Sequence, residues 1–175
     1  IKITSTDGDT HVKAGSLYGA TAGSGDIFIT AKNNIIEVGN SPADYSTNGG
    51  IRSGGGSINV TATEGNNTIT TGENVSGIFS YLNKDGEATV WAKKGNNFIT
   101  AGRDGAYTKA GNITVTAGNA NTITANRDGL SATGGKNTIA VTAGKSNTIK
   151  SDHNVMYATE GGVITVQSGE DSMME

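Results

Sequence analysis

Six segments of the chain share an apolar-x-apolar-x-small pattern, and this alternation is the strongest regularity in the sequence. Ile, Val and Ala occupy the evenly spaced positions, and Thr, Asn or Gln occupy most of the positions between them. Strict period-two alternation is typical of a strand that buries one face and exposes the other. The segments recur about every 25 to 31 residues, which predicts a repeat architecture. They begin at Ile27, Ile58, Ala88, Ile113, Ile139 and Ile164.

Two shorter segments recur between these strands in a fixed order. One aligns on Ile3, Ile36, Ile69, Ile99, Ile123 and Ile149. The other aligns on Leu17, Ile51, Ile78, Ala106, Leu130 and Met156. Each repeat cannot close a core alone and must stack on its copies. The pattern therefore predicts an all-β fold, a single-stranded right-handed parallel β-helix (β-solenoid) of about six coils with three short strands each.

Composition agrees with one narrow β-domain. The 175 residues include 27 Gly, 3 Phe and 1 Trp, so small aliphatic side chains must fill the interior. No window sustains the i, i+3, i+4 apolar spacing of a helix, and Pro42 is the single proline. We treat residues 1–175 as one β-solenoid domain. Because the sequence opens at Ile1 without a Met or a signal segment, we expect it to be an excised segment of a longer repetitive protein.

Charge and cysteine content exclude several function classes. The absence of cysteine excludes disulfides and cysteine-based metal sites, and it is compatible with export. A net charge of −3 without a run of Lys or Arg gives no electrostatic footprint for nucleic acid. No apolar stretch is long enough to cross a bilayer, so any membrane attachment would need an anchor outside this segment. We expect no cofactor and no bound metal.

One asparagine recurs two positions before the Ile of the first segment. The even offset places it on the inward side of the strand, where a buried amide must be hydrogen-bonded. Stacked coils would let these amides bond to one another along the axis, which predicts a structural asparagine ladder. Its members are Asn34, Asn67, Asn97, Asn121 and Asn147.

Two stacked acids raise the possibility of catalysis. Asp104 and Asp128 fall at equivalent positions of successive coils, and stacking would bring them within about 5 Å, close enough for a retaining glycosidase pair. The alternative is that Arg-Asp-Gly is a turn sequence in which Asp bonds its own backbone and Gly adopts a positive φ. We favour the turn and assign no catalytic residue.

Aromatic residues suggest a contact surface. Tyr18, Phe79, Tyr107 and Tyr157 share the outward register of the second segment with Arg52 and Ser131. Exposed, they would form a stripe suited to saccharide or protein contact, whereas a register slip of one residue would bury all of them. Trp91 faces outward on a more regular strand. Outward threonines do not repeat on enough coils for a lattice-matching, ice-binding face, since Glu37, Phe98 and Trp91 interrupt their columns.

The longest departures from the repeat are the loops Asp7–Lys13 and Gly39–Gly50, which we expect to meet at one corner of the solenoid. Insertions of this kind either bind a ligand or are tolerated because lengthening a surface loop costs little free energy. The candidate ligand-binding residues are His11, Lys13, Asp44 and Tyr45 in these loops, together with Trp91.

The recurring GNNxIT, Gly turn and ITVTA elements cover nearly the whole chain. This repeat style resembles the passenger regions of bacterial autotransporters and related haemagglutinin-like surface adhesins. The resemblance implies a parallel β-helix, export to the bacterial outer-membrane surface, and noncatalytic attachment to a host-cell glycan or protein receptor, or self-association with like chains. Two alternatives remain: a carbohydrate-active β-helix enzyme or tailspike-like glycan-binding domain, and a purely structural stalk. The absence of a Gly-x-Ser-x-Gly motif weighs against an enzymatic member of this family.

Overall fold

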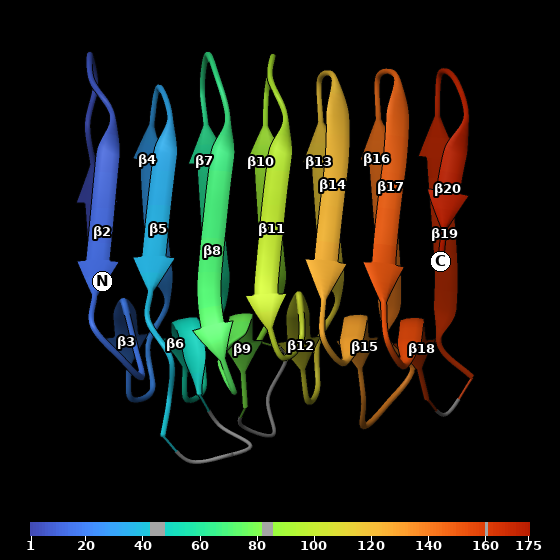
Figure 1. Cartoon of the computed structure of the whole chain (residues 1–175), viewed down its shortest axis with the longest axis horizontal. Helices are drawn as coiled ribbons and strands as arrows, with labels where there is room; N and C mark the ends of the chain where they lie inside the picture. Colours follow the sequence, from blue (N-terminus) through green and yellow to red (C-terminus); the bar gives the residue numbers. More distant parts are fainter. Residues whose placement is uncertain (43–47, 82–85, 160) are drawn as a thin grey trace.

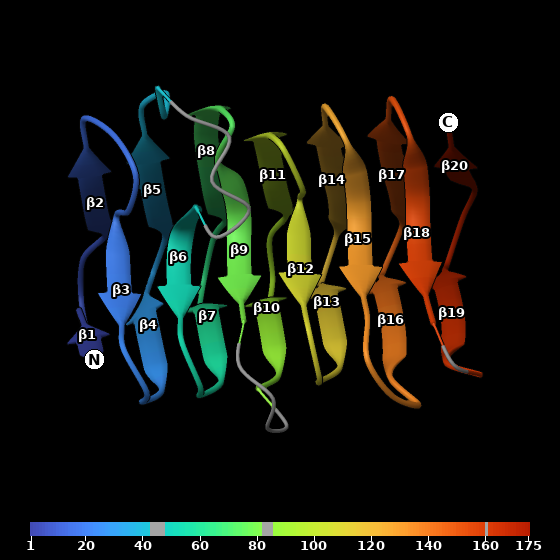
Figure 2. The ribbon, with the colours of Figure 1, turned by 90° about the horizontal axis from the view of Figure 1, so that it is seen from below.

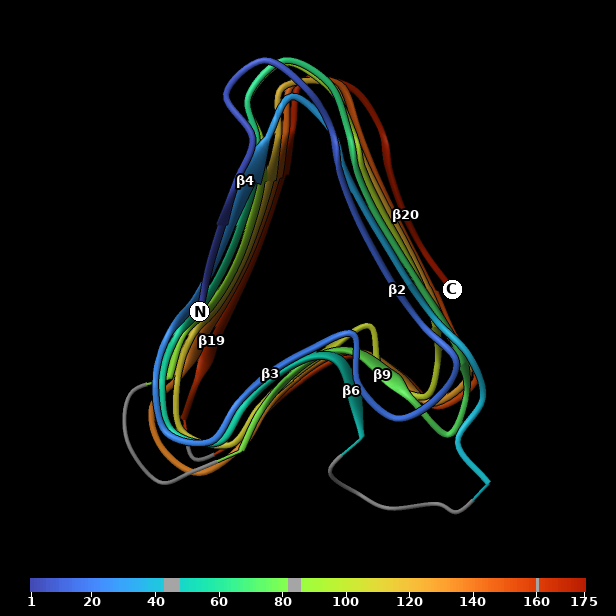
Figure 3. The ribbon, with the colours of Figure 1, turned by 90° about the vertical axis from the view of Figure 1, so that its left-hand side faces the viewer.

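The computed structural model describes residues 1–42, 48–81, 86–159 and 161–175. Within these ranges the chain forms twenty strands and no helix, and all strand pairs are parallel. Successive coils lie side by side along the long axis of the molecule (Figure 1). Viewed along that axis, the coils superimpose as a triangle with one sheet on each side (Figure 3). The predicted fold class, an all-β parallel solenoid with three strands per coil, is confirmed.

We name the three sheets A, B and C. Sheet A contains β1 (Lys2–Thr4), β4 (Ile27–Ala31), β7 (Ile58–Ala62), β10 (Ala88–Ala92), β13 (Ile113–Ala117), β16 (Thr138–Ala143) and β19 (Val163–Ser168). Sheet B contains β2 (Thr10–Ala14), β5 (Asn34–Val38), β8 (Asn67–Glu73), β11 (Asn97–Gly102), β14 (Ala120–Ala125), β17 (Ser146–Ser151) and β20 (Ser172–Met174). Sheet C contains β3 (Ala20–Ala22), β6 (Gly49–Ser53), β9 (Ser76–Ser80), β12 (Ala106–Thr108), β15 (Asp128–Ala132) and β18 (Asn154–Ala158).

The core consists of columns of small aliphatic side chains that run along the axis. In sheet B, Ile36, Ile69 and Ile99 pair in register and are at most 1% exposed. Sheet C contributes Ile51 and Ile78 in the same way. Because side chains alternate across a strand, the residues between these positions lie on the outer face of each sheet. The outer faces of sheets A and B are partly exposed, whereas in sheet C the outer face is itself buried along β9 and β15.

The first coil differs from the sequence alignment. Ile3 pairs with Ile29 in sheet A, and Val12 pairs with Ile36 in sheet B. The segment Thr10–Ala14 is therefore a strand, although the sequence analysis placed it in a loop. The alignment failed here because Thr10, and not an asparagine, stands in register with Asn34.

The second segment of this coil is also shifted. Ala20, and not Leu17, pairs with Ile51. Leu17 has a φ of 67°, a left-handed conformation that does not belong in a strand. The turn Gly15–Gly19 therefore lies where coil one passes from sheet B to sheet C, and the Gly39 amide donates to the Ala14 carbonyl beside it. Asp7–Asp9 precedes β2, at the opposite end of sheet B from Gly39, so the predicted meeting of the two loops at one corner is wrong for the described residues 39–42 and 48–50 of the second loop.

The five ladder asparagines lie at the corner between sheets A and B and are at most 1% exposed. The side-chain amides of the first four each donate to the Oδ1 of the next asparagine along the axis, at 2.8 to 2.9 Å, and Asn147, the last, donates to the Gln167 carbonyl. The same Nδ2 also reaches a carbonyl of sheet A, for example from Asn97 to Thr116 and from Asn121 to Thr142, both at 2.8 Å. The ladder therefore links neighbouring coils and ties sheet B to sheet A.

Replacing Asn97 by Leu should lower the free energy of unfolding by about 1 to 3 kcal/mol, because it removes the acceptor of the buried Asn67 amide and the donor to the buried Asn121 Oδ1. Thr100→Val, at an exposed position of the same strand, is the matched control and should change stability little. Urea unfolding of the two variants measures the difference. Equal midpoints would mean that the ladder contributes nothing to stability.

The ladder has an unsatisfied end that can be repaired. Asn34 Oδ1 is buried and has no hydrogen-bond partner, because Thr10 occupies the preceding ladder position. Thr10→Asn should supply the missing donor and raise the free energy of unfolding by about 1 kcal/mol, measured by urea unfolding. Thr30→Asn makes the same chemical change on the outer face of sheet A and should not stabilise. A stabilisation shared by both variants would point to a cause other than the ladder.

Candidate functional site

One column of side chains runs along the outer face of sheet C. Its members pair in register from strand to strand: Thr21, Arg52, Phe79, Tyr107, Ser131 and Tyr157. The predicted register of the second segment is therefore correct from coil two onward, and Thr21 takes the place assigned to Tyr18. Tyr18 instead lies beneath Arg52, whose guanidinium carbon is 5.2 Å from the ring centroid. Figure 2 shows sheet C face on, and Figure 3 shows that this side of the triangle bends inward.

The aromatic members of the column stack along the axis. The Phe79 and Tyr107 rings lie 5.0 Å apart between centroids at an interplanar angle of 11°, and Tyr81 stacks on Phe79 at 5.8 Å. Phe79 is only 1% exposed although it belongs to the outer face. At Ser131, between Tyr107 and Tyr157, the column has a small side chain in place of an aromatic ring. Tyr157, on the far side of this position, is 44% exposed. The aromatic column is therefore interrupted at Ser131, and one further ring, Tyr157, stands on the next strand.

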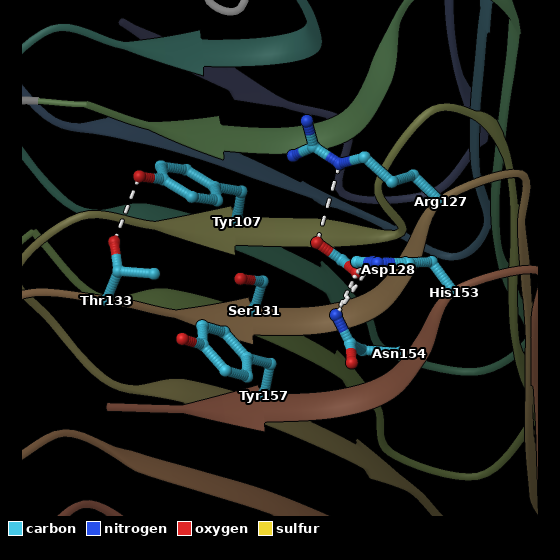
Figure 4. Close-up of a pocket in the computed structure, with 8 residues that line it drawn as sticks. All are labelled: Tyr107, Arg127, Asp128, Ser131, Thr133, His153, Asn154 and Tyr157. Atoms are coloured by element: carbon cyan, nitrogen blue, oxygen red, sulfur yellow. Dashed lines mark hydrogen bonds and ion pairs between the residues drawn. The ribbon is translucent and has the colours of Figure 1, made fainter. Parts of the chain in front are cut away.

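A groove of about 510 Å³ opens at this interruption (Figure 4). Tyr107 and Tyr157 stand on either side of it, with Ser131 between them. Thr133 lies near one end, where its hydroxyl is 2.9 Å from the Tyr107 hydroxyl. The full set of lining residues is Tyr107, Arg127, Asp128, Ser131, Thr133, His153, Asn154 and Tyr157. Three consecutive strands of sheet C and the residues that flank them thus build one site.

A charged network forms the other end of the groove. Asp128 Oδ1 accepts from the side-chain amide of Asn154 at 2.8 Å and lies 3.1 Å from His153 Nδ1. Arg127 Nε lies 3.4 Å from Asp128 Oδ2, and the same guanidinium donates to both oxygens of Asp104 at 2.8 and 2.7 Å. Arg127 alone compensates one of the two carboxylate charges, and Arg103 Nε, 3.8 Å from Asp104 Oδ2, brings a second positive charge to the network.

The two acids differ in their environment. Asp104 is fully buried and is held by Arg127, with Ser76 Oγ 3.2 Å away. Burial raises the pKa of Asp104 above its ordinary value, against the opposing effect of Arg127 and then Arg103. Asp128 lines the groove. Because only one of the two stacked carboxylates faces the groove, they do not form the pair of substrate-facing acids that a retaining glycosidase requires.

Arg103–Gly105 lies in the connection between β11 and β12, as the turn prediction requires, but the predicted positive φ of the glycine is wrong in both Arg-Asp-Gly sequences. Gly129 lies within strand β15, and neither it nor Gly105 has a positive φ. Glycine is required there by space: a Cβ on Gly105 would lie 2.4 Å from the Gly129 carbonyl oxygen, and one on Gly129 would lie 2.4 Å from that of Val155. The close approach of neighbouring coils, and not a turn conformation, selects glycine at this position.

The residues that the sequence analysis selected for ligand binding do not gather in one place. His11 and Lys13 lie on the outer face of β2 in sheet B, where His11 Nε2 is 3.1 Å and Lys13 Nζ 3.5 Å from a Glu37 carboxylate oxygen. The hydrogen bond to His11, followed by the charge of Lys13, lowers the pKa of Glu37. Trp91 is 43% exposed on sheet A, with Lys93 Nζ 5.0 Å from its ring centroid. Asp44 and Tyr45 lie outside the described residues.

Sequence reasoning found the two halves of the groove separately and did not join them. It placed Tyr107 and Tyr157 in one column, and separately it stacked Asp128 with Asp104. It gave no role in binding to Arg127, His153 or Thr133, which also line the groove. The available signal was the short distance in sequence between Asp128 and Ser131, which puts both halves on one strand.

No protein-family model, curated protein or solved structure matches this chain. The described residues contain no helix long and apolar enough to cross a membrane. They also contain no cluster of three or more His, Cys, Asp or Glu side chains that could hold a metal ion.

The raised pKa of Asp104 predicts a pH-dependent stability. A carboxyl group whose pKa is higher in the fold than in the unfolded chain contributes stability that is fully present below the unfolded pKa and is lost as pH rises through the folded pKa. Asp104→Asn cannot titrate and is the reference. The unfolding free energy of the wild type minus that of Asp104→Asn should fall as pH rises from about 3 to 7, as urea unfolding at each pH will measure. A difference that grows with pH would mean that the Arg127 pair outweighs burial.

Proposed function

We propose that this chain is a noncatalytic β-solenoid segment of an extracellular bacterial adhesin. In this proposal it acts at the outer-membrane surface, and the groove on sheet C contacts a host-cell glycan, a protein receptor or a like chain. The observation that carries the proposal is the composition of the groove, in which a half-exposed Tyr157 and the partly buried Tyr107 flank a hydroxyl-bearing floor between two polar ends. Aromatic rings with polar groups beside them suit contact with ligands that have both apolar faces and hydrogen-bonding edges.

The fold supports this role by its rigidity. Equivalent residues of successive coils are held in register by parallel strand pairing, and Tyr107, one wall of the groove, stacks against Phe79 on its other side. A ligand would meet side chains that are already positioned, so little ordering of the protein would oppose binding. The style of the repeats, which resembles that of autotransporter passengers, supports placing the segment at the cell surface.

The groove is less suited to hydrolysis. Asp104 is buried beneath Arg127, and Asp128 already accepts from Asn154 and lies beside His153. A general acid or base must reach the proton that it transfers, and a second carboxylate must reach the opposite side of the scissile bond. The other alternative is a purely structural stalk. A stalk needs only coils that stack regularly, and the interruption of the aromatic column on sheet C does nothing for that stacking.

Adhesion of the purified chain tests the proposal with a closely matched pair of variants. Tyr157 and Trp91 are exposed to almost the same extent, 44% and 43%, but they lie on different sheets. Beads coated with the chain should adhere to host cells or to sister bacteria, and Tyr157→Ala should reduce adhesion about tenfold through loss of an aromatic contact. Trp91→Ala should leave adhesion unchanged.

The other outcomes separate the alternatives. Loss of adhesion in Trp91→Ala alone would move the binding surface to sheet A. A wild-type chain that binds neither kind of cell would favour the structural stalk. Release of reducing sugar from polysaccharides, lost in Asp128→Asn, would identify the chain as an enzyme.

A further inference from the structure

The gap above Ser131, between the side chains of Tyr107 and Tyr157, is a slot wide enough for one ring. We propose that the gap between Tyr107 and Tyr157 binds a single pyranose ring of a saccharide, stacked between the two tyrosines above Ser131. This assignment rests on the proposed function and specifies its ligand as a glycan. It is drawn from the register of three neighbouring strands and from the polar groups around the gap.

The spacing of the strands sets the width of the slot. Neighbouring strands lie about 4.8 Å apart, so the backbone positions of Tyr107 and Tyr157, two strands apart, are separated by about 9.6 Å. Figure 4 shows both rings extending along the same side of the sheet, with the Ser131 side chain between them. A ring at the level of Ser131 would have one tyrosine about 4.8 Å away on each face.

The protein already contains the stacking geometry that a guest would adopt. Phe79 and Tyr107 occupy the same column on adjacent strands and stack at 5.0 Å with almost parallel rings. A guest at the level of Ser131 would stand in the same relation to Tyr107 as Phe79 does on its other side. It would complete a column that the serine leaves open.

The groups around the slot favour a sugar over a flat aromatic side chain. Thr133 lies near one end, and Asp128, His153 and Asn154 lie at the other. His153 directs Nδ1 toward Asp128 and Asn154, and its side chain is 70% exposed. A pyranose offers apolar C–H faces to the tyrosines and hydroxyls at its rim to these groups. An aromatic guest would cover the same polar groups without bonding to them, which costs free energy.

Charge restricts the saccharide further. The Arg127 guanidinium is engaged by both oxygens of Asp104 and lies beside Asp128, so the groove presents no unpaired cation to an acidic sugar. The site therefore suits a neutral pyranose. The experiment accordingly uses three neutral probes: methyl β-glucopyranoside, methyl α-mannopyranoside and methyl N-acetyl-β-glucosaminide.

Saturation-transfer NMR on the full chain tests the assignment, with sorbitol as an acyclic polyol control and p-cresol as a flat aromatic probe. At least one pyranoside should bind, and its C–H protons on both ring faces should receive saturation, since a tyrosine lies on each side. Sorbitol should not bind. Tyr157→Ala should weaken binding about tenfold by removing one wall, and Trp91→Ala should not change it.

Ser131→Tyr is the decisive variant because it fills the slot with the aromatic ring that the column lacks. It should abolish pyranoside binding while the chain keeps its thermal unfolding midpoint, since Phe79 and Tyr107 show that aromatic residues pack on adjacent strands of this column. If Ser131→Tyr fails to fold, Tyr157→Ala still decides the question, because its side chain is half exposed.

Each remaining outcome counts against the assignment in a different way. Binding of p-cresol without any pyranoside would make the slot a socket for an aromatic side chain of a protein partner. Undiminished pyranoside binding by Ser131→Tyr would place the sugar elsewhere. If Tyr157→Ala loses cell adhesion and no pyranoside binds, the saccharide assignment fails while the adhesin proposal stands. If neither adhesion nor pyranoside binding is seen, both fail.

Discussion

Parallel backbone hydrogen bonds between successive coils hold equivalent residues about 4.8 Å apart, and every other feature of the molecule depends on this spacing. A side chain repeated on each coil meets its own copy above and below. Ile and Val therefore form continuous apolar columns, and asparagine amides lie within hydrogen-bonding distance of one another. The same spacing brings backbone so close at Gly105 and Gly129 that no Cβ fits.

Because the spacing is uniform, replacing one residue of a column changes the contacts only of the residues directly before and after it in that column. Thr10 in place of a ladder asparagine leaves Asn34 Oδ1 without a donor. Ser131 in place of an aromatic residue opens a groove between Tyr107 and Tyr157. The first exception leaves a buried polar atom unsatisfied, whereas the second leaves two aromatic faces partly free. The second is therefore the one that a ligand could use.

These exceptions also mark what sequence reasoning could and could not predict. From coil two onward the Asn and Ile positions repeat, so the fold, the ladder positions and the register of sheet C followed from the pattern. Coil one was misaligned because Thr10 lacks the asparagine signal and the turn at Leu17 is left-handed. The groove was not predicted because its depth depends on ring stacking and on the bend of sheet C, and neither is encoded in spacing along the chain.

At the charged end of the groove, two aspartates at equivalent positions differ in their surroundings and therefore in what they can do. Asp104 and Asp128 occupy equivalent positions in successive coils, yet Asp104 is enclosed by Arg127 from the next coil while Asp128 borders the groove. Arg127 can neutralise Asp104 only by lying across the coil boundary, and in doing so it also approaches Asp128. The stacking that could have paired two acids for catalysis instead converts one of them into an anchor for the arginine. The groove thus presents a single carboxylate that already accepts a hydrogen bond from Asn154, so a second acid does not stand opposite it as paired acid–base catalysis requires.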